Sequence, residues 1–278
     1  MAHRQGSTLA FSGALLLSVA IFALVMVVMG ARLDRDVSPA PASEAEVARQ
    51  GLAGRAAAIA KDAEFAQAAG QWTEALGGVW VPWPEGAPEG YTNPSAPYTA
   101  SSDVHKELIE LSKAALDSSL GPVATSIGIS SLALGATDAD QCGDYELTDL
   151  ARSLTTGVAV ENIETARQWF EWHAATLPRG QRDAELARID ELSDLLDAQL
   201  AAGAPDDRPV IAPEPEGGNY VEDSYRLLID QLAFSATQAD QAGKQAIAAF
   251  VCRFSQAPDA PLIEALPGIE AASASAAR

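Results

Sequence analysis

Apolar residues are densest near the start of the chain, in a run from Gly6 to Ala31 that holds no Asp, Glu, Lys, Arg or His. As an α-helix, residues 9–30 reach about 33 Å, which is enough to cross a hydrocarbon core of about 30 Å. The apolar core of a cleaved signal peptide is usually only about 7–15 residues long. We therefore expect an uncleaved transmembrane helix at 9–30, preceded by a short cytoplasmic tail at 1–8.

Small residues recur on one face of this expected helix. Ala10, Ala14 and Ser18 are spaced by four positions, and Gly13 lies beside them. Small side chains let membrane helices approach closely, so these four residues are candidates for contact with a partner helix. The alternative is that alanine and glycine are simply common in membrane helices.

After a Pro- and Ala-containing linker at 31–43, apolar positions follow helical spacing, and alternating β-branched runs are nearly absent. The pattern predicts helices at 43–76, 104–120, 123–135, 145–154, 160–177, 181–202 and 220–255. Short turns favour antiparallel neighbours. We expect an all-α protein whose main domain, 44–256, is an antiparallel four- to five-helix bundle, followed by a disordered tail at 257–278. The nearly uncharged stretch 123–135 is the expected core helix.

Prolines and aromatic residues alternate in Val79–Tyr98, which excludes a helix there. We expect an ordered strap whose aromatic side chains lie on the bundle. An exposed Trp-Pro strap also suits contact with a glycan or a protein surface. The candidate residues for a partner surface are Trp80, Trp83, Tyr91 and Tyr98.

Two cysteines, Cys142 and Cys252, lie far apart in the chain and are expected to form one disulfide. They lack the Cys-x-x-Cys spacing of a redox pair. Disulfides persist in oxidising compartments. The charges that flank the apolar run, Arg4 on one side and Arg32 and Arg35 on the other, do not decide the orientation. The expected disulfide therefore places the main domain outside the cytoplasm, attached to the cell membrane by a single pass.

The chain is strongly acidic, with 18 Lys and Arg residues against 38 Asp and Glu residues and a net charge of −20. No cluster of Lys and Arg is present. Binding of DNA, RNA or anionic lipid depends on such clusters, so a nucleic-acid partner is not expected.

Acidic residues near Cys142 have part of the spacing of a calcium-binding loop. Asp138, Asp140, Asp144, Glu146 and Asp149 fall near positions 1, 3, 7, 9 and 12 of such a loop. However, position 5 is Cys142, and position 12 is Asp149 rather than a bidentate glutamate. A solvated acidic turn explains the cluster better than a calcium site does, so the cluster is only a weak calcium candidate and we expect no resident metal.

Motifs for catalysis are missing from the sequence. There is no Gly-x-Ser-x-Gly, Ser-x-x-Lys or Glu-x-x-His. We expect no enzymatic activity and no cofactor. Trp169, Trp172 and His173 share one face of a predicted helix, which suits either stacking on a sugar or quinone ring or packing in the core.

The order of the helices and the stretch Gly77–Pro84, with the sequence Gly-Gly-Val-Trp-Val-Pro-Trp-Pro, resemble membrane-anchored, ferritin-like helical-bundle proteins of high-GC bacteria. This resemblance implies a helical bundle. The ferritin ligand motif, Glu-x-x-His, is absent, so iron chemistry is carried over to no residue.

These patterns favour a non-catalytic accessory or interaction subunit of a membrane or cell-envelope complex. The alternative is an extracytoplasmic binding protein for a small apolar ligand or calcium.

Overall fold

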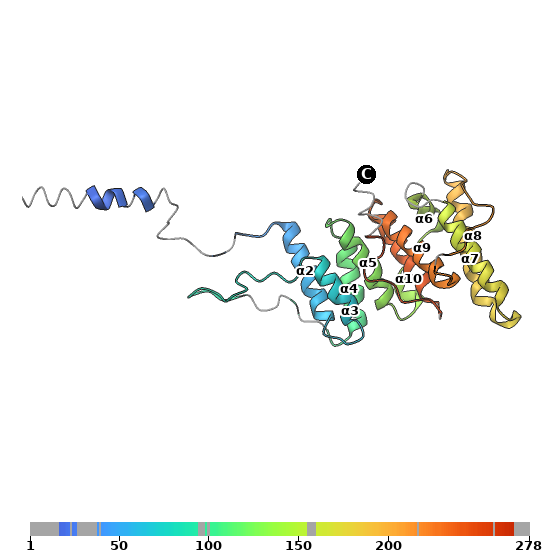
Figure 1. Cartoon of the computed structure of the whole chain (residues 1–278), viewed down its shortest axis with the longest axis horizontal. Coiled ribbons are helices and arrows are strands. Elements are labelled where there is room, and N and C mark those ends of the chain that lie inside the picture. The colour runs from blue at the N-terminus through green and yellow to red at the C-terminus, as the bar shows by residue number, and fades with distance from the viewer. Residues whose placement is uncertain are drawn as a thin grey trace, which may run out of the picture. The chain divides into compact units, whose positions relative to one another are not determined.

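A computed structural model describes residues 17–22, 24–26, 38, 40–93, 98, 101–154, 160–215, 217–257 and 259–269 (Figure 1). The chain divides into two compact units. The first consists of Met1–Pro41 and Pro82–Asn93, and the second of Ala42–Val81 and Pro94–Arg278.

In the first unit, residues 17–22 and 24–26 are helical, and most of their apolar side chains, among them Leu17 and Phe22, are exposed. Among the residues that the structure describes, no helix combines the length and apolar character needed to cross a membrane. Most of the expected span at 9–30 lies outside the described residues, as do Ala10, Gly13 and Ala14, the tail at 1–8 and most of the linker at 31–43. Ser18 lies in the described helical part.

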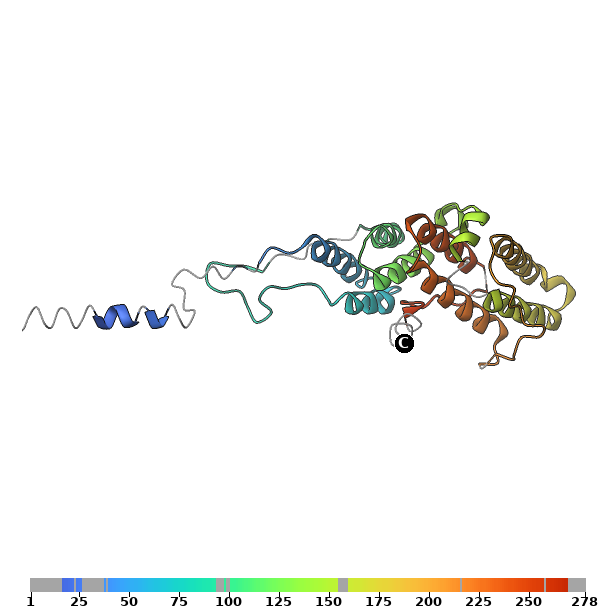
Figure 2. The same ribbon diagram turned by 90° about the horizontal axis from the view of Figure 1, so that it is seen from above.

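The second unit is a helical bundle, and no strand occurs in the described ranges, which confirms the all-α class (Figures 1 and 2). Its α-helices are α2 (Glu44–Ile59), α3 (Ala66–Ala75), α4 (Val104–Leu116), α5 (Pro122–Gly135), α6 (Leu147–Leu154), α7 (Val160–Thr176), α8 (Asp183–Ala201), α9 (Tyr220–Ala236) and α10 (Gln241–Ser255). Two 3₁₀ turns, η1 (Ala139–Cys142) and η2 (Arg179–Gln181), lie between them.

The bundle contains more and shorter helices than the expected four or five. The helix predicted at 43–76 is broken between α2 and α3, where the Asp62 carboxylate accepts a hydrogen bond from the backbone N–H of Glu64. The helix predicted at 220–255 is broken between α9 and α10, where Asp240 caps α10 by accepting from the N–H of Gly243. In both places a short acidic side chain bonds to the local backbone and competes with continuation of the helix.

The core consists of two hydrophobic clusters. Trp72, which is fully buried, belongs to the first cluster, which joins α2, α3 and α4. Phe170, Tyr225 and Phe250 belong to the second, which joins α7, α9 and α10. Helix α5 contributes Ile127 to the first cluster and Ile129 to the second. The expectation that 123–135 is a buried core helix is therefore confirmed.

Helices α4 and α5 pack unusually closely because two glycines of α5 face α4. A Cβ atom on Gly128 would lie 2.6 Å from Cγ of Leu116, and one on Gly135 would lie 2.7 Å from Cβ of Leu108. The hydroxyl of Ser112 donates a hydrogen bond of 2.6 Å to the carbonyl of Gly128 across the same contact. A larger residue at either glycine would push the two helices apart.

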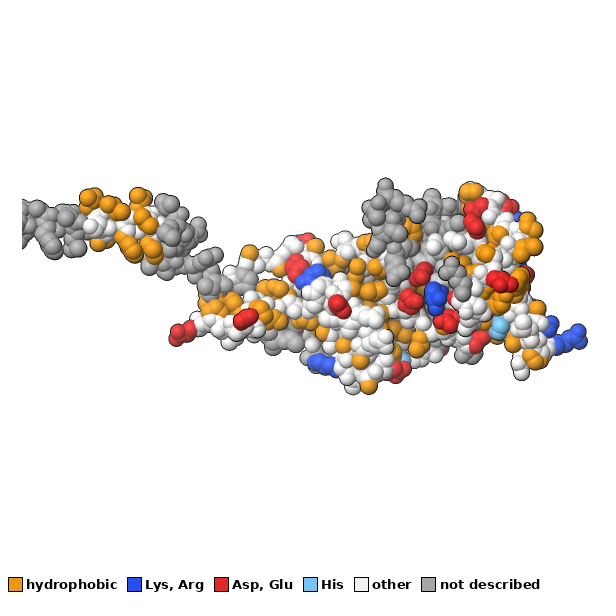
Figure 3. All heavy atoms as spheres, in the orientation of Figure 1, with side chains coloured by type: hydrophobic (Ala, Val, Ile, Leu, Met, Phe, Trp, Pro, Cys, Tyr) orange, Lys and Arg blue, Asp and Glu red, His pale blue; other side chains and the backbone are white. Residues whose placement is uncertain are grey.

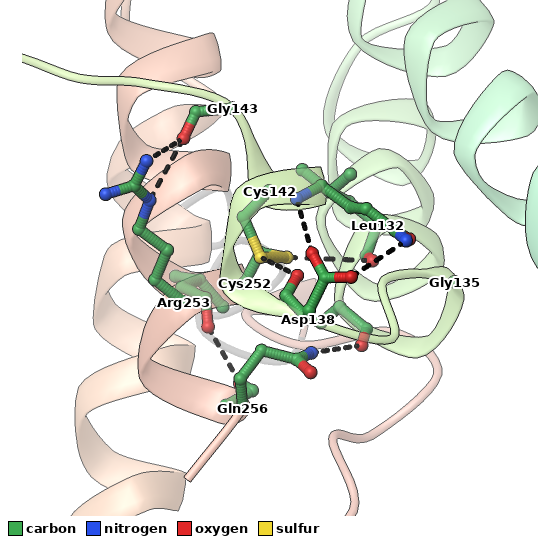
Figure 4. Close-up of a disulfide and its surroundings, with 12 residues drawn as sticks. Leu132, Gly135, Asp138, Cys142, Gly143, Cys252, Arg253 and Gln256 are labelled. Carbon is green, nitrogen blue, oxygen red and sulfur yellow. Dashed lines mark hydrogen bonds between the residues drawn. A yellow bond between two sulfur atoms is a disulfide. The ribbon is translucent and has the colours of Figure 1, made fainter.

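The expected disulfide is confirmed. Cys142, at the end of η1, is bonded to Cys252 of α10, with the two Cα atoms 5.5 Å apart (Figure 4). Around it, the guanidinium of Arg253 donates to the carbonyl of Gly143 at 2.7 and 3.0 Å. The side chain of Gln256 donates to the carbonyl of Ala133 at 3.2 Å. The acidic loop after α5 is thus held against α10 by the disulfide and by the hydrogen bonds of Arg253, while Gln256 links the end of α10 to α5.

Candidate functional site

Residues 259–269, here called the C-terminal segment, are ordered and packed on the bundle. The prediction that the chain is disordered from residue 257 is wrong for this segment, while residues 270–278 lie outside the described residues. Ala265, Pro267 and Gly268 are buried. The segment closes one side of the Trp72 cluster, to which Ala265 belongs. The segment packs here because it covers apolar surface of the bundle and accepts hydrogen bonds from buried donors.

Buried donors of α3 and α5 bond to backbone carbonyls of the C-terminal segment. The indole Nε1 of Trp72 donates to the carbonyl of Ala265 at 2.7 Å, and the hydroxyl of Ser130 donates to the same oxygen at 2.8 Å. The hydroxyl of Ser126 donates to the carbonyl of Pro267 at 2.8 Å. Buried donors need acceptors, and here the extended segment supplies them.

The end of the segment lies directly against α9. The backbone N–H of Gly268 donates to the carboxylate of Asp230 at 2.9 Å. Gly268 has a φ of 74°, and a Cβ there would lie 2.7 Å from the backbone nitrogen of Phe234. Both the positive φ and the close approach require glycine at this position.

The start of the segment is held by a buried arginine of α8. The guanidinium of Arg188 forms an ion pair with Asp259 and lies 2.9 Å from Glu185. The hydrogen bonds from Arg188 lower the pKa of Asp259. His173 of α7 completes the cluster, with its Nδ1 2.9 Å from the Glu185 carboxylate. The aromatic ring of Phe170 lies 5.6 Å from the guanidinium carbon.

A cavity of about 730 Å³ lies beside the C-terminal segment. Ligand pockets in proteins commonly measure about 300–1,000 Å³. Residues before and within α3 form one wall, the C-terminal segment forms another, and α5 and α9 complete the lining. The apolar part of the lining includes Phe65, Ala68, Leu134, Leu262, Leu266 and Ile269. Leu262 is 88% exposed, so the apolar surface continues from the cavity onto its rim.

The polar part of the lining contains carboxylates and amides. These residues are Glu64, Gln67, Gln71, Asp230 and Glu264. No Lys, Arg or His is present among the described residues that line the cavity. Asp230 bonds to the Gly268 N–H, and Glu264 lies 3.8 Å from Arg226. The cavity therefore combines an apolar floor with a negatively charged rim.

The four aromatic residues predicted to form a partner surface do not share one environment. Trp83 and Tyr91 belong to the first unit and pack on each other, with ring centroids 5.4 Å apart. In the bundle, Trp80 is 42% exposed. Trp83 and Tyr91 are half-buried, so Trp80 is the most exposed of these three residues.

Tyr98 is half-buried and contacts α2 and α4 of the bundle. Its hydroxyl donates a hydrogen bond to Glu107 of α4, and the guanidinium carbon of Arg55 lies 4.4 Å from the centre of its ring. Burial and the hydrogen bond to Glu107 raise the pKa of Tyr98. The expectation that aromatic residues of 79–98 lie on the bundle is thus met at Tyr98.

The calcium interpretation is wrong for the described residues, which contain no group of three or more His, Cys, Asp or Glu residues that could hold a metal ion. Asp138 instead caps η1, Asp144 pairs with Arg253 at 2.8 Å, and Asp149 pairs with Arg152 at 2.8 Å. Asp140 is exposed in η1, and Glu146 precedes α6. Three of the five acidic residues, Asp138, Asp144 and Asp149, therefore cap a turn or pair with an arginine.

Trp169, Trp172 and His173 do not form one stacking surface. Trp169 is buried, and its Nε1 donates to the carbonyl of Pro213 at 2.7 Å. The ring of Trp172 packs on Tyr220 at a centroid distance of 5.5 Å. His173 contacts Glu185, as described above. Each ring is used within the bundle.

The sequence pattern predicts disorder for the C-terminal segment and therefore does not reveal the lining of the cavity. A usable signal was present. The apolar residues Leu262, Ile263, Leu266 and Ile269 recur around Pro267-Gly268, a pair typical of an ordered turn.

No family model, curated protein or solved structure matches the chain.

Proposed function

We propose that the protein is a non-catalytic accessory subunit of a membrane or cell-envelope complex, and that the bundle binds an apolar part of its partner in the cavity beside the C-terminal segment. The observation that carries this proposal is the cavity of about 730 Å³, with its apolar floor and the exposed Leu262 at its rim. Exposed apolar surface of this kind is typical of interaction sites. The lining supplies apolar contacts and hydrogen-bonding groups, which hold a ligand in place.

The proposal includes a single transmembrane helix at 9–30, with the bundle outside the cytoplasm. The length and uncharged character of the run from Gly6 to Ala31 support the anchor. Apart from Ser18, its described part, 17–22 and 24–26, consists of apolar residues, which suits a lipid environment. The disulfide between Cys142 and Cys252 supports an oxidising compartment. The small residues Ala10, Gly13, Ala14 and Ser18 remain the proposed contact with a partner helix.

The proposed partner is a protein rather than a nucleic acid, because the chain is strongly acidic. In Figure 3, acidic side chains are spread over the visible face and basic ones are few and separate. A net charge of −20 without a basic cluster is unfavourable for binding the phosphates of a nucleic acid.

The cavity proposal is tested by filling the cavity. Ala68→Trp places an indole in the lining, while Ala187→Trp makes the same change at an exposed position of α8, which contributes no described lining residue. Full-length tagged protein is purified from native membranes in mild detergent. We expect partners that accompany the wild type and Ala187→Trp to be lost from Ala68→Trp. Equal recovery from both variants would contradict the proposal.

The anchor is tested separately. The protein is expected to stay in the membrane fraction after alkaline carbonate extraction, and its bundle to be digested by protease added from outside to spheroplasts. Release by carbonate would contradict the anchor, and protection from protease would contradict the orientation.

Replacing Ala10, Ala14 and Ser18 with leucine tests the proposed contact with a partner helix. The replacement is expected to reduce co-purification of partners while leaving the protein in the membrane.

A second candidate is a binding protein for a small apolar ligand. The cavity volume, which lies in the range of small-molecule sites, favours it. Native mass spectrometry of full-length protein released from detergent distinguishes the two. A bound small molecule, present in Ala187→Trp and absent from Ala68→Trp, would favour this second candidate.

A further inference from the structure

The charge on the rim of the cavity restricts the chemistry of whatever occupies it. Glu64 precedes α3 on one side, and Glu264 belongs to the C-terminal segment on another side. Asp230 of α9 adds a third carboxylate, already engaged with the Gly268 N–H. No positive side chain is present among the described lining residues.

An occupant that covers these carboxylates removes water from them. Loss of water from an ionised carboxylate is unfavourable unless a positive charge or a hydrogen-bond donor replaces it. Glu64 has no side-chain partner among the described residues, and Glu264 has only a distant pairing with Arg226 at 3.8 Å, with both side chains exposed. An occupant that carries its own positive charge is therefore favoured over a neutral or negative one.

The remaining polar lining suits a peptide. Gln67 and Gln71 lie one helical turn apart on α3, and both are exposed at the cavity. A glutamine side chain both donates and accepts hydrogen bonds, as does a peptide group. The exposed Leu262 extends the apolar surface beyond the cavity, which suits a chain that continues past it.

We propose that the cavity binds an apolar peptide segment of a partner protein that carries one or two Lys or Arg side chains, with the basic groups lying against Glu64 and Glu264. This inference rests on the proposed function, because it specifies the part of the partner that enters the cavity.

The test uses full-length protein in phosphatidylcholine nanodiscs and three short fluorescent peptides. The peptides share their apolar positions and carry Lys, Gln or Glu at the same two polar positions. Binding is measured by fluorescence anisotropy, with empty nanodiscs as the baseline. We expect the Lys peptide to bind about three- to tenfold more tightly than the Gln peptide, the scale of two partly exposed ion pairs, and the Glu peptide to bind more weakly than both.

Substitutions test which glutamates cause the preference for the Lys peptide. Glu64→Gln combined with Glu264→Gln is expected to remove the preference for the Lys peptide and to leave binding of the Gln peptide unchanged. Glu74→Gln is the matched control, because Glu74 is an exposed glutamate of the same helix, α3, that does not line the cavity. It is expected to keep the preference.

The outcomes separate this inference from the proposed function. If the Gln and Lys peptides bind equally, and Ala68→Trp abolishes both, the cavity binds apolar segments and the charge inference is wrong. If Glu74→Gln removes the preference as fully as the double variant, the preference comes from overall charge and the inference is again wrong. If no peptide binds the wild type, both this inference and the proposed peptide-binding function fail.

Discussion

The indole Nε1 of Trp72 donates a hydrogen bond of 2.7 Å to the carbonyl of Ala265, 193 positions later in the chain. Both residues are buried in the same hydrophobic cluster. This contact joins α3 to the C-terminal segment and therefore joins two walls of the cavity. The shape of the candidate site depends on an interaction between distant parts of the sequence.

Trp72→Phe is expected to lower the free energy of unfolding by about 1–3 kcal/mol, since it removes the donor and part of a buried ring. Ser130 still donates to the same carbonyl, so the oxygen stays paired. Urea unfolding followed by circular dichroism measures the change. Trp80→Phe is the control, because Trp80 is substantially exposed and is expected to change stability by less than about 0.5 kcal/mol. Similar losses in both variants would contradict a specific role for the Trp72 hydrogen bond.

Gly268→Ala is expected to displace the C-terminal segment from α9. The added Cβ would meet the backbone of Phe234 at 2.7 Å, and the residue would have to adopt a φ of 74°. Hydrogen exchange at 261–269 should become faster, and the apolar occupant should bind more weakly. Gly180→Ala, where a Cβ meets nothing within 4 Å, is expected to leave both measurements unchanged. Wild-type rates of hydrogen exchange at 261–269 in Gly268→Ala would show that the segment stays on the bundle without the close approach of Gly268 to α9.

The sequence predicts local features of this fold better than distant ones. The apolar positions Leu108, Leu111 and Ala115 of α4 lie at helical spacing and are buried as that spacing predicts. The cysteine pair is predictable because no other cysteine is present. In contrast, the acceptors of Trp72, Ser126 and Ser130 are backbone carbonyls, which every residue possesses. Nothing in the local sequence indicates which carbonyls these donors reach.

The cavity is hard to predict for the same reason. Its lining comes from residues before and within α3, from α5, from α9 and from the C-terminal segment. Glu64 and Glu264 are two hundred positions apart, and each alone has the pattern of an ordinary surface glutamate. They come to one rim only because the C-terminal segment packs on the bundle beside α3.

The glycines of α5 should tolerate no side chain. Gly128→Ala and Gly135→Ala are each expected to reduce the free energy of unfolding by about 1–3 kcal/mol, because the added methyl group overpacks the contact with α4. Gly70→Ala in α3 is the matched control, since a Cβ there meets nothing within 4 Å. That variant is expected to increase stability by about 0.5–1 kcal/mol, because alanine favours a helix interior over glycine. Urea unfolding of the three variants checks this difference in sign.

Reduction of the disulfide is expected to destabilise the bundle by about 2–5 kcal/mol, because Cys142 and Cys252 close a loop with a sequence separation of 110. Thermal unfolding with and without a reducing agent measures the effect in the wild type. The variant that carries both Cys142→Ala and Cys252→Ala should melt at the temperature of the reduced wild type, and reductant should not change it. A wild-type melting temperature that reductant leaves unchanged, with reduction verified by mass spectrometry, would contradict this prediction.

The pair of Asp259 and Arg188 should make the attachment of the C-terminal segment sensitive to acid. The pKa of Asp259 is lower in the folded protein than in the unfolded chain, because Arg188 donates hydrogen bonds to its carboxylate. The stabilising contribution of the pair is therefore complete above the unfolded pKa of about 4 and is lost as the pH falls through the lower folded pKa. Asp259→Asn removes this charge and leaves Glu185 and His173 in place.

The melting temperature of Asp259→Asn should be below that of the wild type at pH 6, and the difference should shrink as the pH falls below about 4. Taking the difference at each pH cancels the acid sensitivity of the other carboxylates. Asp206→Asn is the control, because Asp206 also has a lowered pKa from its pairing with Arg208, but that pair is exposed on the loop between α8 and α9. Its difference from the wild type should be small at every pH, since exposed ion pairs contribute little. A difference for Asp259→Asn that stays constant from pH 6 to pH 2 would mean that the charge of Asp259 does not contribute to the attachment of the segment.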